Sequence, residues 1–230
     1  MHLPFNQLVI ASGNKGKLKE LAHLLAPLGL EIIPQAALNV PEAEEPYATF
    51  IENALAKARH ASKITGLPAL ADDSGLCVDA LQGAPGVISA RYACETADTP
   101  KSDTRNNEKL LAVMADEKNR HAHFYCVIVL VRHEHDPEPM IAEGIWAGEI
   151  LSALKGEDGF GYDPLFLDAK TGKTVAELPL EIKSRISHRG HAMTKLLQKL
   201  ERLSSLATPT NLTGQSGYAM TRAWSPAQKK

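Results

Sequence analysis

The N-terminal part of the chain alternates short apolar runs with stretches in which apolar residues recur every three or four positions. Residues 7–11 and 30–33 are mainly apolar, which predicts two short buried strands. Between them, leucines at helical spacing predict a helix over residues 15–28, namely Leu18, Leu21, Leu25 and Leu28. A second helix is predicted from a capping threonine, Thr49, to the stop signal at Gly66. Its predicted apolar stripe consists of Ile51, Ala54, Leu55, Ala58 and Ala61.

The same two patterns continue through the rest of the chain. In chain order they predict strands at 69–71 and 76–78 flanking a turn at 72–75, a loop at 82–93, a helix at 103–117, strands at 124–131 and 140–151, and a helix at 188–203. Strands interleaved with helices indicate an α/β fold. The long neighbouring strands after residue 121 favour antiparallel pairing, so we expect a mixed β-sheet flanked by helices.

The last part of the chain, residues 204–230, departs from this periodicity. Fifteen of its 27 residues are Ser, Thr, Gly, Pro, Asn or Gln, and no helical or strand pattern is visible. Such a segment buries too little apolar surface to fold. We therefore expect a single folded domain over residues 1–203 and a flexible tail over 204–230.

Composition and charge exclude several classes of protein. Hydrophobic residues make up 44% of the chain, and the net charge of −2 gives no reason to expect binding to nucleic acid or to a membrane surface. The apolar stretch at 121–131 is too short for the ~20 residues that span a bilayer. No secretory signal is visible, and Cys77, Cys94 and Cys126 show no C-x-x-C spacing. We expect a cytoplasmic protein whose cysteines are small buried hydrophobic residues.

Two polar clusters are candidates for phosphate and metal binding. Residues 12–17 read Ser-Gly-Asn-Lys-Gly-Lys and open a predicted helix, where free N–H groups and the helix dipole favour an anion. Their spacing is not that of a Walker A loop, and an ordinary strand-to-helix turn also fits. Asp72 and Asp73 supply the oxygen ligands that Mg²⁺ prefers, although an Asx-turn or a helix cap also fits. In a strand, at most one of them faces a given site unless the turn re-aims the other.

Two further clusters suit a nucleobase. Phe160 and Tyr162 lie among three glycines in residues 156–164, and exposed rings there can stack on a base, a contact worth about 1–3 kcal/mol. A glycine-rich loop with core aromatics is the alternative. The segment 183–190 gathers side chains that can donate hydrogen bonds to phosphate or carbonyl oxygens, although such a run can also be a solvated face: Lys183, Arg185, His188 and Arg189. Together the four clusters supply the parts of a nucleotide-processing site.

At this point the chain resembles the inosine triphosphate pyrophosphatases, also called dITP/XTP or non-standard purine NTP pyrophosphatases. The matching segments occur in family order over about residues 7–203. They are S-G-N-K-G-K (12–17), T-F-I-E-N-A-L-A-K-A (49–58), A-D-D-S-G-L (71–76), G-A-P-G-V-x-S-A-R-Y (83–92), G-F-G-Y-D-P (159–164) and K-S-x-I-S-H-R-G (183–190).

The resemblance implies Mg²⁺-dependent hydrolysis of ITP, dITP or XTP to the monophosphate and pyrophosphate. It also implies a homodimer and an elongated mixed α/β fold with a substrate cleft between two lobes. Asp73 would be the general base and a metal ligand, and Glu44 a second metal ligand. The implied substrate-binding residues are Ser12, Gly13, Asn14, Lys15, Gly16, Lys17, Ser74, Phe160, Gly161, Tyr162, Asp163, Lys183, His188 and Arg189.

Base selectivity has a physical basis in these residues. Hypoxanthine and xanthine carry a 6-oxo acceptor where adenine carries a 6-amino donor. A cationic donor such as Arg189 or Lys183 would pair with the oxo group and stay unpaired against adenine, a mismatch that can be worth ~10⁴–10⁵ in discrimination. Guanine also has a 6-oxo group, so its rejection requires another feature near its 2-amino group. For His188, helix capping or packing is as good an expectation as base contact.

Two other functions remain open on the sequence alone. A related house-cleaning pyrophosphatase for modified pyrimidine or methylated nucleotides would share the phosphate loop and the acids but not the 159–164 and 183–190 segments. A non-catalytic nucleotide sensor would bind the triphosphate without turnover. An interaction protein, for which these segments are only surface, fits six linked motifs poorly.

Overall fold

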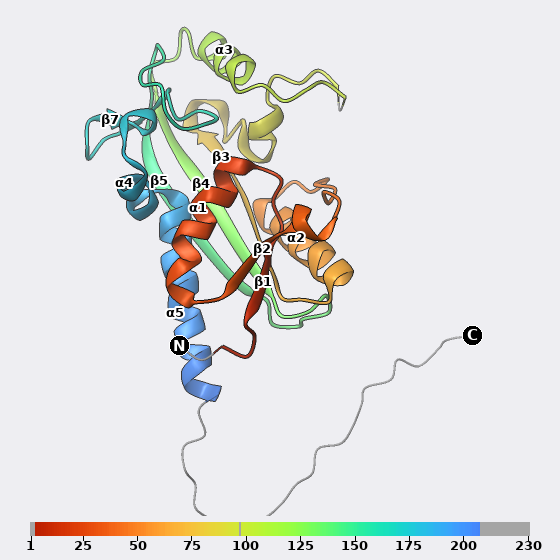
Figure 1. Cartoon of the computed structure of the whole chain (residues 1–230). Coiled ribbons are helices and arrows are strands. Elements are labelled where there is room, and N and C mark those ends of the chain that lie inside the picture. The colour runs from red at the N-terminus through yellow and green to blue at the C-terminus, as the bar shows by residue number, and fades with distance from the viewer. Residues whose placement is uncertain (1–2, 97, 208–230) are drawn as a thin grey trace, which may run out of the picture.

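The computed structural model of the chain describes residues 3–96 and 98–207 (Figure 1). Within that range one seven-stranded sheet has the order β2-β1-β3-β4-β5-β6-β7. Its strands are β1 (Gln7–Ile10), β2 (Glu31–Pro34), β3 (Ala69–Val78), β4 (His121–Val131), β5 (Met140–Ile150), β6 (Phe166–Asp168) and β7 (Lys173–Thr174). The α-helices are α1 (Lys15–Leu25), α2 (Phe50–Thr65), α3 (Asp103–Val113), α4 (Leu180–Ile186) and α5 (His188–Ala207).

The sheet is mixed, as the sequence predicted. β1 pairs in parallel with β2 and β3, whereas β3, β4 and β5 pair antiparallel over ten registered residue pairs at each boundary. β4 is the central strand, and it runs with β5 diagonally through the whole molecule in Figure 1. These long strands form the frame on which both ends of the protein are built.

Helices cover both faces of one end of the sheet. α1 and α5 pack their leucines and Met193 against one face, and α2 packs against the other through alanines that let it approach closely. Thr49 caps α2 through the amide of Glu52, and Gly66 ends it with a φ of 67°, as the sequence predicted. Ile51 was expected in the apolar stripe of α2, but it is 41% exposed. It lies in the first turn of the helix, away from the alanines that meet the sheet.

A separate core forms at the other end of the long strands. Phe124, Trp146 and Phe166 pack there with two residues of the α3 region. These are Leu110, which lies in α3, and Met114, which is its C-cap. We call this end the small lobe and the end covered by α1, α2 and α5 the large lobe. β3, β4 and β5 pass through both lobes, so the two-lobed mixed α/β fold expected from the sequence is confirmed.

The structure corrects several local predictions. Residues 72–75 are not a turn but the middle of β3, because each pairs with β4 from Asp72↔Ile128 to Gly75↔Tyr125. The predicted loop 82–93 contains a 3₁₀-helix, Gly86–Arg91. α3 ends at Val113 rather than at 117, and α5 extends to Ala207, beyond the expected start of the tail. Residues 208–230 lie outside the described residues, and the single domain over 1–203 stays a prediction.

Two further expectations concern burial. Cys126 is buried as predicted, but Cys77 and Cys94 are only half-buried. Across the described ranges, no helix is both long enough and apolar enough to cross a bilayer.

Candidate active site

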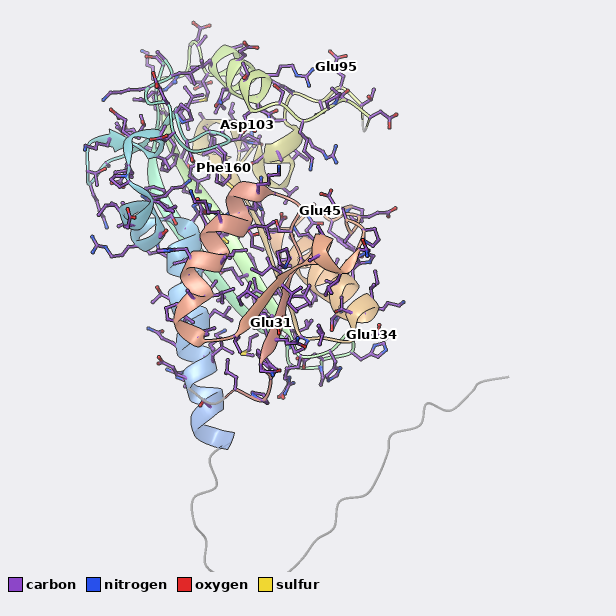
Figure 2. The ribbon with its side chains drawn as sticks, in the orientation of Figure 1. Glu31, Glu45, Glu95, Asp103, Glu134 and Phe160 are labelled. Atoms are coloured by element: carbon purple, nitrogen blue, oxygen red, sulfur yellow. The ribbon has the colours of Figure 1, made fainter. Side chains whose placement is uncertain are left out.

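A cavity of about 620 Å³ lies between the two lobes. Fourteen of the residues singled out from the sequence line it: Ser12, Gly13, Asn14, Lys17, Glu44, Asp73, Ser74, Phe160, Gly161, Tyr162, Asp163, Lys183, His188 and Arg189. Lys15 and Gly16, also predicted as substrate-binding, are not among its lining residues. Figure 2 shows Phe160 and Asp103 above α1, and Glu45 beside the large lobe. Segments far apart in the chain therefore share one space.

The start of α1 forms one wall of the cavity. Asn14 caps the helix by accepting a hydrogen bond from the amide of Lys17 at 3.0 Å. Ser12 accepts one from the amide of Asn14 at 3.3 Å, which tightens the turn out of β1. The first turn of a helix presents free N–H groups with a favourable dipole, and Lys17 adds a full positive charge. This wall is suited to binding phosphate.

Asp73 lies on the large-lobe wall and is 5% exposed. Its carboxylate accepts hydrogen bonds from Lys57 at 3.0 Å and from Asn53 at 3.3 Å, and Lys57 also pairs with Glu45 at 2.9 Å. Burial raises the pKa of Asp73, and the Glu45 carboxylate adds to this effect, whereas Lys57 and Lys17 oppose it. The net result is a raised pKa, which moves this carboxyl toward the range useful for a general base.

Asp72 lies on the opposite face of β3, as strand geometry requires, and it is not among the cavity-lining residues. It pairs with Lys17 at 3.2 Å and with Arg189 at 3.1 Å, and it accepts a hydrogen bond from Ser74. Burial alone would raise the pKa of Asp72, but Lys17 and Arg189 hold it well below its usual range. Asp72 is thus a permanent buried anion beneath the site, on the other side of the strand from Asp73.

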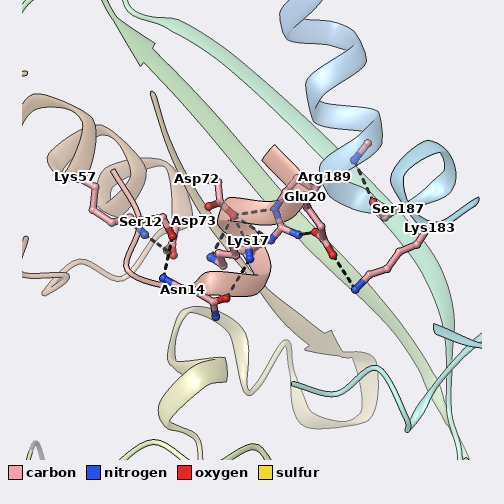
Figure 3. Close-up of polar contacts among 12 residues, drawn as sticks. Ser12, Asn14, Lys17, Glu20, Lys57, Asp72, Asp73, Lys183, Ser187 and Arg189 are labelled. Atoms are coloured by element: carbon pink, nitrogen blue, oxygen red, sulfur yellow. Dashed lines mark hydrogen bonds and ion pairs between the residues drawn. The ribbon is translucent and has the colours of Figure 1, made fainter. Parts of the chain in front are cut away.

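A chain of buried ion pairs continues from Asp72 to the small lobe (Figure 3). Arg189 bonds to both Asp72 and Glu20, and the second oxygen of Glu20 pairs with Lys183 at 2.8 Å. Lys183 also pairs with Asp163 at 2.7 Å. Three cations, counting Lys17, therefore alternate with three anions. A buried charge is stable only when it is paired and hydrogen-bonded, so these side chains hold one another in place.

Residues 156–164, which we call the aromatic loop, form the small-lobe wall. The amide of Phe160 donates to Asp163 at 3.0 Å, and the Lys183 ammonium lies 4.5 Å from the centre of the Phe160 ring. The ring also lies against Gly16, where an added Cβ would come within 2.7 Å of it. Tyr162 differs from the expectation of a second stacking ring, because it is 4% exposed in the small-lobe core and donates to the Ser89 carbonyl at 2.9 Å.

His188 begins α5 but does not cap it, since Ser187 accepts the hydrogen bond from the amide of Gly190. Its ring is stacked on Phe124 with centroids 4.8 Å apart, and its buried Nδ1 has no hydrogen-bond partner among the described residues. Burial and the nearby Arg189 and Lys183 cations hold the pKa of His188 well below its usual value. The cavity therefore has a neutral imidazole as part of its lining.

The carboxylates of the cavity also bear on metal binding. Within residues 3–96 and 98–207, no three Asp, Glu, His or Cys side chains gather closely enough to form a metal cage. Mg²⁺ at phosphate-processing sites is usually held by one or two carboxylates together with water and substrate oxygens. Asp73 and Glu44 both line the cavity and supply that smaller set, so these residues fit Mg²⁺ held jointly with a substrate.

Several site residues were not predicted from the sequence. Lys57 and Asn53 both belong to the segment 49–58 that carries the family resemblance, which was the available signal. Glu45 is adjacent to the predicted Glu44, yet it is Glu45 that shares Lys57 with Asp73. Glu20 gave no local signal, because it is a single acid on a predicted helix.

Comparison with known proteins shows which family the chain belongs to. A sequence model of the Ham1 family matches residues 8–199. The dITP/XTP pyrophosphatase of Nitrosomonas europaea is 59% identical over 195 residues, which cover 85% of this chain and 94% of that protein. The dITP/XTP pyrophosphatase of Ralstonia nicotianae is 58% identical over 194 residues, covering 84% and 96%.

Solved structures give the same family. A HAM1 protein from Coxiella burnetii superposes with a TM-score of 0.78 at 47% identity, covering 86% of this chain and 100% of that one. The Ham1 protein of Staphylococcus aureus superposes with a TM-score of 0.74 at 40% identity, covering 86% and 99%.

Proposed function

The chain belongs to the Ham1 family, and from that premise we propose that it hydrolyses dITP, ITP and XTP to the nucleoside monophosphate and pyrophosphate. One observation carries the proposal. Four residues of the turn at 12–17 line a single cavity together with Asp73 and Phe160: Ser12, Gly13, Asn14 and Lys17. A nucleoside triphosphate combines the matching parts, with phosphates at one end and a flat base at the other.

The triphosphate binds to the start of α1. Cleavage of the α–β phosphate bond increases negative charge on the pyrophosphate leaving group, and donors already in place stabilise that charge without reorganisation. Lys17, at the start of α1, supplies such a donor. Lys57 lies beside Asp73, and the surrounding carboxylates raise its pKa above the ordinary lysine value despite burial, so it stays protonated.

Asp73 is the general base that orients the attacking water and accepts its proton. Its raised pKa makes the carboxylate a better proton acceptor than an ordinary aspartate. Lys57 and Asn53 fix the two carboxylate oxygens, so the base is oriented before substrate arrives. Asp73 and Glu44 are also the residues that would hold Mg²⁺, which when bound supplies positive charge to the phosphate oxygens.

The nucleobase of the substrate lies against Phe160, with Lys183 and His188 beside it. Lys183 is the cation that can donate to a 6-oxo group, and the neutral ring of His188 can also hydrogen-bond to a base. Arg189 is better suited to positioning than to base contact. It is 1% exposed, and its guanidinium already bonds to Asp72, Glu20 and Ser74.

The remaining assignments follow from the family. We propose a single catalytic domain over residues 1–203, Mg²⁺ as cofactor, a homodimer, a cytoplasmic location and no nucleic-acid partner. The nearly even charge balance, a net −2, supports the last of these.

The test is release of pyrophosphate from ITP, dITP, XTP, ATP and GTP by the full chain with Mg²⁺, with and without EDTA. We expect turnover of the first three, strongly reduced turnover of ATP and GTP, and no turnover with EDTA. Turnover of ATP as fast as that of ITP would contradict the proposal that Lys183 and His188 select a 6-oxo purine. Turnover restricted to modified pyrimidine or methylated nucleotides would identify a different house-cleaning pyrophosphatase, and tight binding without turnover would identify a sensor.

A further inference from the structure

The first turns of α3 hold both backbone polar groups of Gly161, a residue of the aromatic loop. The carboxylate of Asp103 accepts a hydrogen bond from the amide of Gly161 at 2.7 Å. The side-chain amide of Asn107 donates to the carbonyl of Gly161 at 2.9 Å. Asp103 and Asn107 are four positions apart, so both side chains leave the same face of the helix.

The aromatic loop depends on such support. Gly159 and Gly161 have φ values of 87° and 63°, in the left-handed region that favours glycine. Glycine loses more backbone entropy on ordering than any other residue, so a segment with two of them needs external anchors to keep one conformation. Asp163 anchors the amide of Phe160, and Ser89 anchors the hydroxyl of Tyr162. Among the described residues, only the two α3 side chains bond to the backbone N–H and C=O of Gly161.

α3 is itself fixed to the small lobe. Ser102 caps it by accepting from the amide of Arg105 at 3.3 Å. Asn106 accepts from the amide of Ala93 at 2.8 Å and donates to the carbonyl of Ala90 at 3.2 Å. The helix is therefore attached to the 86–93 segment, which also receives the Tyr162 hydroxyl through Ser89.

From this arrangement we propose that Asp103 and Asn107 are positioning residues that hold Phe160 in place to receive the base. This inference rests on the proposed function and deepens it, because it concerns how the same cavity binds the nucleobase. Asp103 fixes the peptide group between Phe160 and Gly161, and Asn107 fixes the next one, so the backbone beside Phe160 is held and the ring is in place before substrate binds. Neither side chain acts on the phosphates in this role.

The experiment compares wild type with Asp103→Ala, Asp103→Asn and Asn107→Leu. It measures KM and kcat for ITP and the inhibition constants of IMP and inorganic pyrophosphate. We expect Asp103→Ala and Asn107→Leu to raise KM for ITP and the inhibition constant of IMP about five- to tenfold, the usual effect of losing one hydrogen bond. We expect kcat and the inhibition constant of pyrophosphate, which has no base, to stay within about twofold.

Two controls separate positioning from general damage. Asp103→Asn keeps an oxygen that can accept from Gly161, so it restores most of the affinity lost in Asp103→Ala. Glu108→Ala changes an exposed acid on the same helix and leaves all four constants as in wild type. Thermal unfolding of every variant identifies any that is poorly folded. If Asn107→Leu is poorly folded, the comparison of Asp103→Ala with wild type is the test.

Three results would overturn the proposal. An equal increase in the inhibition constants of IMP and pyrophosphate would mean that the whole cavity is disturbed. A defect in Asp103→Asn as large as in Asp103→Ala would mean that the carboxylate contacts substrate directly. If KM, kcat and both inhibition constants are as in wild type in Asp103→Ala and in Asn107→Leu, the two α3 side chains do not position Phe160. If wild type itself fails to hydrolyse ITP, the proposed function is wrong, and the positioning role that rests on it is wrong as well.

Discussion

Glu20 of α1 accepts a hydrogen bond from Arg189 at the start of α5, although 169 positions separate them in the chain. Both side chains are buried, and the second oxygen of Glu20 pairs with Lys183 of α4. One carboxylate therefore holds together three helices that meet below the cavity. Since buried ions are stable only with their partners, the ion pairs fix the relative positions of these helices.

Substitution of Glu20 is expected to destabilise the protein strongly. Glu20→Ala leaves Arg189 and Lys183 each short of a partner in a buried site, and breaking such a pair costs about 3–5 kcal/mol. Urea denaturation measures the unfolding free energy. Glu117→Ala, an exposed acid, is the control and should change it by less than about 0.5 kcal/mol. A Glu20→Ala loss as small as the control's would mean that the ion pairs do not hold the fold.

Substitution of Asp73 is expected to remove catalysis while leaving the fold intact. Asp73→Asn keeps the shape of the side chain but cannot accept the proton of water, so kcat for ITP should fall at least ~10²-fold. Asp79→Asn removes an exposed carboxylate just beyond the end of β3 and serves as the control. Pyrophosphate release gives the rates. Turnover at the wild-type rate in Asp73→Asn would exclude Asp73 as the base.

The acid side of the pH–rate profile is expected to report Asp73. Because its pKa is raised, kcat/KM should begin to fall at a higher pH than an ordinary aspartate would give, as the base becomes protonated. The Glu45 carboxylate contributes to that raised pKa, so Glu45→Gln should move the acid limb to lower pH. Glu31→Gln, far from the cavity on β2, should leave the limb in place. An unchanged limb in Glu45→Gln would argue that another group titrates.

Gly144 of β5 is expected to tolerate no side chain. An added Cβ would lie 2.0 Å from the carbonyl oxygen of His188 and 2.6 Å from the amide nitrogen of Ala192, both backbone atoms of α5. Gly144→Ala should therefore displace the start of α5, lower the unfolding free energy by about 1–3 kcal/mol and raise KM for ITP. Ala147→Ser, at an exposed position of the same strand, is the control. Wild-type stability in Gly144→Ala would show that α5 can move without cost.

Local patterns predicted most of the secondary structure and the regions that form the cavity. The helix spacing of the leucines in α1 and the cap at Thr49 are local signals, and both are confirmed. The turn predicted at 72–75 was wrong because Ser and Gly favour turns locally, whereas pairing with β4 over the full length of β3 decides the conformation. Tertiary hydrogen bonding overrode the local preference there.

The buried ion pairs could not be predicted for a similar reason. Glu20 and Lys57 each look like an ordinary charge on the polar side of a helix, and only the folded chain shows what lies opposite them. For Arg189 the sequence offered either phosphate or carbonyl oxygens as partners. The structure instead gives it Asp72 and Glu20, which come from two separate elements.

The neighbouring aspartates of β3 have a consequence for how this sequence can change. Asp73 faces the cavity and Asp72 faces the buried cations only because β3 is in register with β4. Deleting or inserting one residue within β3 would shift the strand by one position and exchange the two faces. Depending on the direction of the shift, either the cavity position of Asp73 or the buried position of Asp72 would then be left without a carboxylate. Length changes in this strand are therefore far more harmful than most single substitutions.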